Sequence, residues 1–371
     1  MKRITLIVLL IFLLTSCVTY NTVHPSRTSV TKLIIPNLDG YLTLLCDFHM
    51  HTVFSDGFVW PTVRVEEAYF EGLTAISITD HIERRIFPKY KSSSHNRSYE
   101  EALTSEKSDN IIIIRGSEIS RDMPPGHINA IFLTDCDELA QENYIDVIRA
   151  AKNQNAFIFW NHPGWKKQQF KKTTTWWPEH TQLLDEGLLH GIEVANGNSY
   201  YPEAHLWCLE KKLTMIGSTD AHNRIPAFAP YHHRTMTIVF ARQRSAESIY
   251  EALIERRTAV YLNNLIIGEE KYLKELFEKS IIIETEKNDN TIIITFNNNT
   301  DILFNIKIEE NEQEIPNLDS NNQKIINILP QSIHTKSIKI TEGITYDKAI
   351  LTIENFLVGP NIKLKYTLEI K

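Results

Sequence analysis

Between about Tyr41 and Leu262, short apolar runs alternate with stretches that have a helical pattern. Ala75–Ile78 and Ala156–Trp160 are continuous apolar runs, whereas Pro61–Phe70 opens on a proline and places its apolar residues on one face. Strands that are buried on both sides read as continuous apolar runs, so this alternation indicates an α/β fold with a parallel sheet covered by helices. Roughly seven such units over residues 39–268 fit a closed or nearly closed barrel better than an open sheet.

The pattern changes after a helix expected at residues 269–279. From residue 280 to residue 371, seven short β-type runs follow one another at roughly ten-residue spacing, separated by Asn, Asp and Gly clusters. This spacing predicts a small all-β, sandwich-like domain. Its one histidine, His334, comes with no cluster of possible ligands, so we expect a structural or docking role for this domain.

The N-terminus resembles a bacterial export signal. Lys2 and Arg3 precede an apolar run, Ile4–Leu14, that is too short to span a bilayer as a mature anchor. We therefore expect residues 1–17 to be a lipoprotein signal peptide, Cys17 to carry the lipid and residues 18–38 to be a flexible tether. The resulting expectation is an exported lipoprotein on the outer membrane that faces the periplasm. A plain secretory signal or a short membrane anchor is the alternative.

The net charge argues against nucleic-acid binding, and the cysteine content limits the kinds of disulfide and metal site to expect. The net charge of −7 argues against non-specific nucleic-acid binding, which needs clustered Lys and Arg. Apart from Cys17, the chain has Cys46, Cys136 and Cys208, an odd number without paired spacing, so a disulfide framework is not expected. Because there is no Cys-x-x-Cys pair, any metal would be bound by nitrogen and oxygen ligands.

Residues that commonly bind metals recur at the ends of the expected barrel strands. His49 and His51 lie two apart on an extended segment, so both rings can face one point. Two hydrogen-bonded histidines at a strand end would be the ordinary interpretation of this pair alone. The carboxyl ends of parallel barrel strands converge on one face, however, and the recurrence of six histidines and three carboxylates there favours a metal site. The nine candidate ligands are His49, His51, Asp56, His81, Glu118, His127, His162, Asp220 and His222.

These motifs make the chain resemble the PHP-domain (polymerase and histidinol phosphatase) metal-dependent phosphoesterases. The resemblance covers about Tyr41 to Leu262 and implies a distorted (β/α)7 barrel with two to three divalent ions, usually zinc, manganese or iron. It rests on His-x-His with Ser-Asp-Gly, Thr-Asp-His, Glu118, Gly-His, Asn-His-Pro and Ser-Thr-Asp-Ala-His. It implies one ion on His49, His51, Glu118 and Asp220, a second on Glu118, His127 and His162, and a third on Asp56, His81 and His222.

The reaction implied by this resemblance is hydrolysis of a phosphoester. Divalent cations offset the negative charge of a phosphate, and a metal-bridging water that loses its proton near neutral pH becomes the nucleophile. The ligands Glu118, Asp220 and His222 are therefore assigned to catalysis, together with Asp80, whose carboxylate is suited to orienting His81 or a neighbouring ring. A turn or helix-cap role is the alternative for Asp80.

Longer strings are similar to one exported subgroup, the Sb-PDE type phosphodiesterases. They are Phe58–Arg64, His95–Tyr99, Trp176–Thr181 and Gly191–Gly197. The sequence hypothesis is therefore a phosphodiesterase that acts on small organic phosphodiesters. The alternatives are a phosphomonoesterase of the histidinol-phosphatase kind and a non-catalytic, metal-carrying surface lipoprotein that binds polysaccharide or a partner.

Substrate contacts are expected among residues that lie in segments after strands. Arg97 and Arg64 are candidates for binding a non-bridging phosphate oxygen. His95 and Trp60 are candidates for the pocket that receives the organic group. For each, an ordinary surface or structural role is the alternative.

Overall fold

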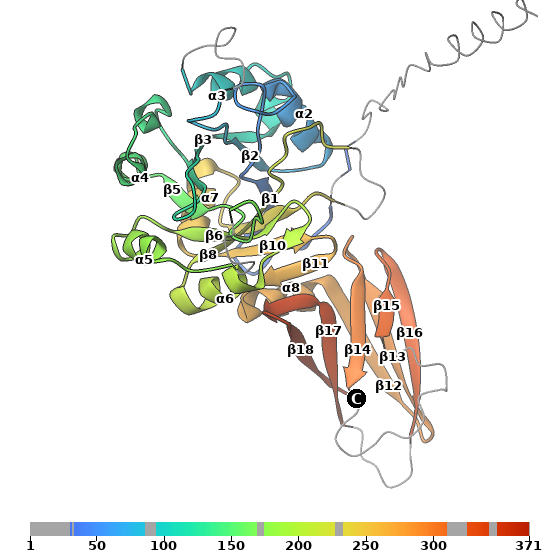
Figure 1. The fold of residues 1–371 in the computed structure, drawn as a ribbon. Helices are drawn as coiled ribbons and strands as arrows, with labels where there is room; N and C mark the ends of the chain where they lie inside the picture. The colour runs from blue at the N-terminus through green and yellow to red at the C-terminus, as the bar shows by residue number, and fades with distance from the viewer. Residues whose placement is uncertain are drawn as a thin grey trace, which may run out of the picture.

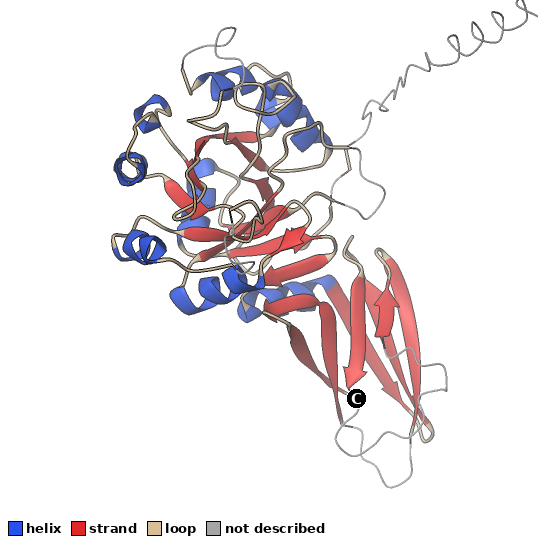
Figure 2. Cartoon of the chain, in the orientation of Figure 1, coloured by secondary structure: helices blue, strands red, loops and turns tan. Residues whose placement is uncertain are grey.

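The computed structural model describes residues 30–31, 33–85, 94–168, 174–226, 233–309, 325–340 and 347–370. The expected signal peptide, its Cys17 and the tether up to residue 29 lie outside these residues. Within them, helices surround the strands of the N-terminal two thirds, and strands dominate the C-terminal third (Figure 1, Figure 2). The chain therefore has the mixed α/β class that its sequence predicts.

Several helices begin where local chemistry favours a helix start. The helix α2 (Pro61–Phe70) has proline in its first turn, where no backbone N–H is needed. The Asn143 side chain accepts a hydrogen bond at the start of α4 (Tyr144–Asn153), and Ser245 does the same for α7 (Ala246–Ile254). The other α-helices of the described residues are α3 (Arg97–Ala102), α5 (Pro178–Asp185), α6 (Pro202–Lys211) and α8 (Glu270–Ser280).

The central sheet is a curved, mixed sheet. Parallel pairs join β1 to β2, β2 to β3, β5 to β6 and β6 to β8. Antiparallel pairs join β3 to β4, β4 to β5, β1 to β9 and β9 to β10. Its strands are β1 (Leu42–Asp47), β2 (Ala75–Ile78), β3 (Ile112–Ile119), β4 (Ile128–Ile131), β5 (Phe157–Trp160), β6 (Gly191–Asn196), β7 (Ser199–Tyr200), β8 (Thr214–Ser218), β9 (Met236–Ala241), β10 (Thr258–Leu262) and β11 (Leu265–Gly268).

The expectation of an all-parallel sheet is wrong at β4 and β9. Eight residues separate β3 from β4, fewer than the dozen or more that a parallel crossover needs, so the chain turns back and β4 runs antiparallel. As a result, the amino end of β4 lies at the same edge as the carboxyl ends of β3 and β5. His127, which directly precedes β4, therefore reaches that edge.

The central sheet curves until β8 lies beside β9 and β10, which pair with other strands of the same sheet. The Thr237 hydroxyl accepts from the backbone N–H of Gly217 at 3.0 Å and donates to its carbonyl at 2.9 Å. The Thr258 hydroxyl donates to the carbonyl of Met215 at 2.9 Å. A Cβ on Gly217 would lie 2.3 Å from Val260 Cγ1, so this position requires glycine. Side-chain contacts thus join β8 to β9 and β10, and among the described strands β8 pairs in a ladder with β6 alone.

The C-terminal strands form two sheets that share a hydrophobic core with α8. One sheet pairs β12, β13 and β16; the other pairs β15, β14, β17 and β18 and continues into the central sheet through β11. Phe277 of α8 contacts Phe304, Phe356 and Tyr366. The strands are β12 (Ile281–Lys287), β13 (Thr291–Asn298), β14 (Phe304–Glu309), β15 (Ile325–Ile328), β16 (Ser332–Lys339), β17 (Lys348–Gly359) and β18 (Ile362–Glu369).

The end of the expected tether is packed against the fold, which corrects its boundary. Leu33 and Leu38 are buried in the core that includes the C-terminal strands. The backbone of Ile34 exchanges hydrogen bonds with Asp301, which precedes β14, at 2.7 and 3.0 Å. Burial of two leucines gives this segment a fixed position that its polar-rich upstream sequence does not predict. None of the helices among the described residues is long and apolar enough to cross a lipid bilayer.

Candidate metal centre

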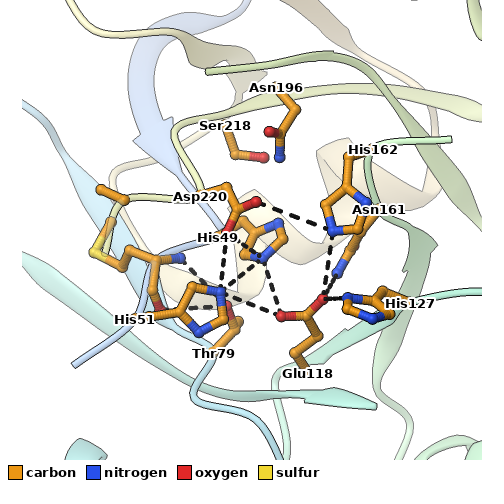
Figure 3. Close-up of polar contacts among 12 residues, drawn as sticks. His49, His51, Thr79, Glu118, His127, Asn161, His162, Asn196, Ser218 and Asp220 are labelled. Carbon is orange, nitrogen blue, oxygen red and sulfur yellow. Dashed lines mark hydrogen bonds and ion pairs between the residues drawn. The ribbon is translucent and has the colours of Figure 1, made fainter. Parts of the chain in front are cut away.

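All nine candidate ligands gather at one edge of the central sheet. Figure 3 shows six of them, which come from different strand ends and point toward one another. Six of the nine are buried outright, and the three others, His127, Asp220 and His222, are half-buried. The fold therefore concentrates six imidazoles and three carboxylates in a small, mostly water-excluded volume.

Glu118, near the end of β3, lies at the centre of this cluster. Its Oε2 is 3.1 Å from His81 Nδ1, 3.2 Å from His51 Nε2 and 3.3 Å from His49 Nε2. Its Oε1 is 2.7 Å from His127 Nδ1 and 3.6 Å from His162 Nε2. One carboxylate thus touches five histidines from four segments of the chain, as a bridging ligand would.

Asp220 and Asp56 are the other two carboxylates of the cluster. Asp220 Oδ1 lies 3.0 Å from His51 Nε2 and 3.3 Å from His49 Nε2. Asp56 Oδ1 lies 3.1 Å from His222 Nε2 and 3.4 Å from His81 Nε2. Asp220 therefore makes its shortest histidine contacts to His51 and His49, whereas Asp56 makes its shortest histidine contacts to His222 and His81.

The donor atoms fit divalent cations better than a hydrogen-bond network. His49 Nε2 faces His51 Nε2 at 3.1 Å as well as two carboxylate oxygens, and one ring nitrogen carries at most one proton to share among them. Imidazole and carboxylate donors that converge on common points are the ligands of zinc, manganese and iron sites. Among the residues that the structure describes, four groups have ligand atoms within 4.8 Å of one another: His51, Asp56, His81 and His222; His49, His51 and Asp220; His49, Glu118 and His162; and His81, Glu118 and His127.

The pKa values of two side chains in the cluster reflect how closely its charged groups are packed. Burial lowers the pKa of His49, but the charges of Asp220, Glu193 and Glu118 more than reverse this and raise it well above its ordinary value. Burial raises the pKa of the Glu118 carboxyl, but the histidines around it hold it well below its usual range. The raised pKa of His49 means that its ring retains a proton in the absence of a cation, and a bound cation would displace that proton.

A crystal structure from Bacteroides vulgatus places the chain in a family. That structure, described as a two-domain protein containing a predicted PHP-like metal-dependent phosphoesterase, is 46% identical to this chain. It covers 92% of this chain and 99% of its own, with a TM-score of 0.87. The chain belongs to the PHP-like metal-dependent phosphoesterases.

Other comparisons are more distant. A structure of a metal-dependent phosphoesterase from Bifidobacterium adolescentis is 16% identical, covers 57% of this chain and 96% of its own, and has a TM-score of 0.40. An uncharacterised protein of Methanocaldococcus jannaschii is 38% identical over 82 residues, which span 22% of this chain and 36% of that protein. No family model matches the chain.

Glu193 is a carboxylate of the PHP-like centre that the sequence analysis did not assign to the site. It lies in β6 and is fully buried. Its Oε1 accepts from His49 Nδ1 at 2.8 Å and from the Ser218 hydroxyl, and its Oε2 accepts from the His162 backbone N–H at 2.6 Å and from Asn196. A proton held on His49 Nδ1 leaves Nε2 free to bind a cation. The available signal was an acidic residue inside an otherwise apolar strand.

Asp80 supports the centre in a different way from the one expected. Its Oδ1 accepts from the Thr52 backbone N–H at 2.7 Å and from the Ser55 hydroxyl at 2.5 Å, and its Oδ2 accepts from the Thr52 hydroxyl at 2.5 Å. The Ser55 hydroxyl lies in turn 3.4 Å from His51 Nδ1. Asp80 thus fixes the loop that carries Asp56 and does not contact the ring of His81.

The two arginines expected to bind phosphate have other partners. Arg64 is buried, and its guanidinium donates to the carbonyls of His51, Ala221 and Asn223 and to Glu67. It therefore ties the loop after β1 to the loop after β8. Arg97 pairs with Glu100 and Glu101 of its own helix, so its charge is balanced at the surface. Neither guanidinium pairs with a ligand side chain of the cluster; the contact of Arg64 to His51 is to its backbone carbonyl.

The remaining substrate candidates lie on loops around the centre. Trp60 is 45% exposed and packs on Phe54, in the loop that leads from Asp56 to α2. His95 has a pKa lowered to about 4, chiefly by burial, and its described backbone contact is to Asp137 rather than to the cluster. Trp165, by contrast, contacts the rings of both His127 and His162, with centroids 5.6 and 5.2 Å away. Trp165 is therefore the tryptophan that borders the centre directly.

Proposed function

We propose that this protein is a metal-dependent hydrolase that cleaves phosphoesters, and most specifically a phosphodiesterase for small organic phosphodiesters. The observation that carries the proposal is the convergence of nine imidazole and carboxylate side chains, with Glu118 in contact with five of the histidines. Membership of the PHP-like family supports the phosphoester, and the strings similar to the Sb-PDE subgroup support the diester.

The proposed centre binds two to three divalent ions, of zinc, manganese or iron. His49, His51 and Asp220 would hold one, His127 and His162 a second, and Asp56, His81 and His222 a third, with Glu118 shared between the first two. When bound, such ions supply Lewis acidity, which offsets phosphate charge and makes water nucleophilic near neutral pH.

In this proposal, other side chains orient the ligand rings and limit the access of water. Glu193 holds the proton of His49 on Nδ1, and Ser55, held by Asp80, lies against Nδ1 of His51. Both contacts orient ring nitrogens toward the centre. Half-buried Trp165 covers one side of the cluster, which limits access of bulk water there.

The test compares a diester with a monoester that has the same leaving group. The purified, metal-loaded protein is assayed with bis(p-nitrophenyl) phosphate and p-nitrophenyl phosphate, with Glu118→Gln as the inactive reference and Glu66→Gln, on the exposed face of α2, as the control. Faster, chelator-sensitive cleavage of the diester is the expected result. Faster cleavage of the monoester would replace the diesterase with a phosphomonoesterase, and metal binding without hydrolysis would favour a surface binding protein.

We also propose the finer architecture and the location. The mixed sheet is proposed as a distorted (β/α)7 barrel and the strands after α8 as a β-sandwich domain, in keeping with the two-domain description of the Bacteroides vulgatus protein. Cys17 is proposed as the lipid attachment site of an exported outer-membrane lipoprotein. Cys17→Ser is expected to release the protein from the membrane fraction; retention of the variant in that fraction would contradict the proposal.

A further inference from the structure

An arginine that the sequence analysis did not consider lies at the edge of the cluster. Arg84 follows β2, three residues after His81, and its Nη1 is 3.0 Å from Asp56 Oδ2. The Arg84 side chain is 64% exposed, whereas that of Asp56 is 5% exposed. A solvent-facing cation thus rests on a buried carboxylate of the centre.

The two oxygens of Asp56 face in different directions. Oδ1 is directed at His222, His81 and His51, at 3.1, 3.4 and 3.8 Å, and Oδ2 is directed at Arg84. Arg84 therefore lies on the outer side of this ligand and does not compete for the atom that faces the histidines. Its guanidinium has five N–H donors, and among the described residues Asp56 is its one ion-pair partner.

Contacts on either side of Arg84 fix the position of its loop. The backbone N–H of Ile82 donates to the carbonyl of Glu118 at 2.9 Å. The Glu83 carboxylate accepts from the Ser120 backbone N–H at 2.8 Å and pairs with Arg121. The backbone just before Arg84 is thus tied to β3 and the segment that follows it, which keeps the guanidinium beside the cluster.

Two other arginines near the centre, Arg64 and Arg121, already bond to groups of the protein itself. Arg64 donates to three carbonyls and a carboxylate, and Arg121 donates to the carbonyls of Ser120 and Gln141 besides pairing with Glu83. Arg84 differs because most of its donors are left for a ligand. A planar guanidinium with paired donors matches two oxygens of a phosphoryl group.

We propose that Arg84 binds a non-bridging phosphoryl oxygen of the substrate at the outer edge of the centre. This assignment rests on the proposed phosphoesterase function and names the side chain that recognises the phosphate. Arg84 thereby takes the role that the sequence analysis had considered for Arg64 and Arg97.

The test compares Arg84→Gln and Arg84→Lys with a matched control, Arg242→Gln. Arg242 is also a surface arginine, 61% exposed, with a carboxylate partner, Glu251, at 2.7 Å, but it follows β9 and so lies at the opposite edge of the sheet. Loss of one charged hydrogen-bonded pair is expected to weaken binding roughly 10- to 100-fold. We expect Arg84→Gln to raise KM by this factor and to weaken inhibition by inorganic phosphate similarly, Arg84→Lys to retain part of the effect, and Arg242→Gln to match the unsubstituted protein.

Two further readouts distinguish phosphate binding by Arg84 from a purely structural role. Bound metal per chain is measured in each variant, because loss of metal from Arg84→Gln would show a structural role through Asp56 and overturn the proposal. Binding of inorganic phosphate to the metal-loaded protein is measured by calorimetry, which needs no turnover. If phosphate binds equally well with and without Arg84, the proposal fails; if phosphate binding depends on Arg84 but no ester is cleaved, the proposed hydrolase function fails instead.

Discussion

Individual side chains explain why the ring nitrogens of the centre face inward. A fully buried carboxylate such as Glu193 is costly unless its oxygens are satisfied, and here four donors satisfy them. One of these donors is His49 Nδ1, which fixes the ring so that Nε2 faces Glu118 and Asp220. Glu193 therefore acts on the centre through a ligand and not by contact with a substrate.

We predict that Glu193→Gln lowers metal affinity roughly 10- to 100-fold, the range typical for the loss of a partner behind a metal ligand. Glutamine keeps the shape but removes the charge that holds a proton on Nδ1. The measurement is a competition titration with a chelator of known affinity, with Glu210→Gln on the exposed side of α6 as the control. Equal affinities of Glu193→Gln and the unsubstituted protein would refute this role.

The candidate ligands could be predicted from the sequence more readily than the residues around them. The nine candidates could be found because they follow or precede apolar runs, and the sheet brings those ends together. Glu193 was missed because it lies within an apolar run and not after one, and sequence alone does not show whether an acid at such a position is buried or faces solvent. Arg64 was misassigned because the acceptors of its hydrogen bonds are backbone carbonyls, which no residue pattern reveals.

At the scale of elements, the short link between β3 and β4 makes β4 antiparallel to its neighbours but still places His127 in the metal centre. The reversal of β4 places His127 beside Glu118, at 2.7 Å. His180 of α5 holds this link in place. Its Nε2 donates to the carbonyl of Pro125, which lies in the link, at 2.8 Å, and its Nδ1 accepts from the Trp177 N–H. Its ring also stacks on Trp160. A neutral, buried His180 thus fastens the segment that leads to His127.

We predict that His180 makes the metal-free protein sensitive to acid. Burial lowers the pKa of His180 to about 4, whereas an unfolded chain has a histidine pKa of about 6.5. The unfolded state therefore binds more protons between these values, and the stability that His180 contributes is present above pH 6.5 and lost as the pH falls toward 4. The contribution is on the order of 2–3 kcal/mol.

The measurement is the free energy of unfolding by urea at pH 7 and pH 4.5. The difference between the two pH values should be smaller in His180→Gln, because glutamine takes up no proton. His190 and His205, whose pKa values are also lowered to about 4 by burial, remain in both proteins and provide a common background. An unchanged difference would show that His180 does not titrate in this way.

At the scale of the whole molecule, residues 33–39 contact both the central sheet and the C-terminal strands. Leu33 and Leu38 are buried, Asp39 pairs with Lys279 of α8, and Ile34 is bonded to Asp301. The central sheet also continues into the C-terminal strands through β11 and β17. The C-terminal strands are thus joined to the catalytic part by hydrogen bonds as well as by α8.

We predict that Leu38→Ala lowers the free energy of unfolding by roughly 2–5 kcal/mol, because it opens a cavity in the shared core. Ile34→Ala provides the matched control in the same segment, since the side chain of Ile34 is 49% exposed, and its effect is expected to be under about 0.5 kcal/mol. Both are measured by urea denaturation. Similar effects of the two substitutions would contradict the packed position of this segment.

The positions of helices such as α2 and α4 could be predicted from the local sequence, but the way in which the elements assemble could not. The bounds of α2 and α4 follow from proline, capping residues and periodicity within the segment itself. The direction of β4, the side-chain contacts between β8 and β9, and the docking of Leu33 and Leu38 depend on residues that are distant in the chain. Such contacts leave no local pattern, which is why the tether was placed too far into the fold.

Metal-dependent hydrolysis at the nine-residue cluster is the central claim, and one titration tests it most directly. Metal-free protein is titrated with Mn²⁺ or Zn²⁺ while bound metal and the hydrolysis of bis(p-nitrophenyl) phosphate are followed in the same samples. We expect activity to appear only as metal binds, to saturate at two to three ions per chain, and to vanish with chelator. Hydrolysis that persists in the metal-free protein, or saturation with metal without any phosphoester hydrolysis, would contradict the account.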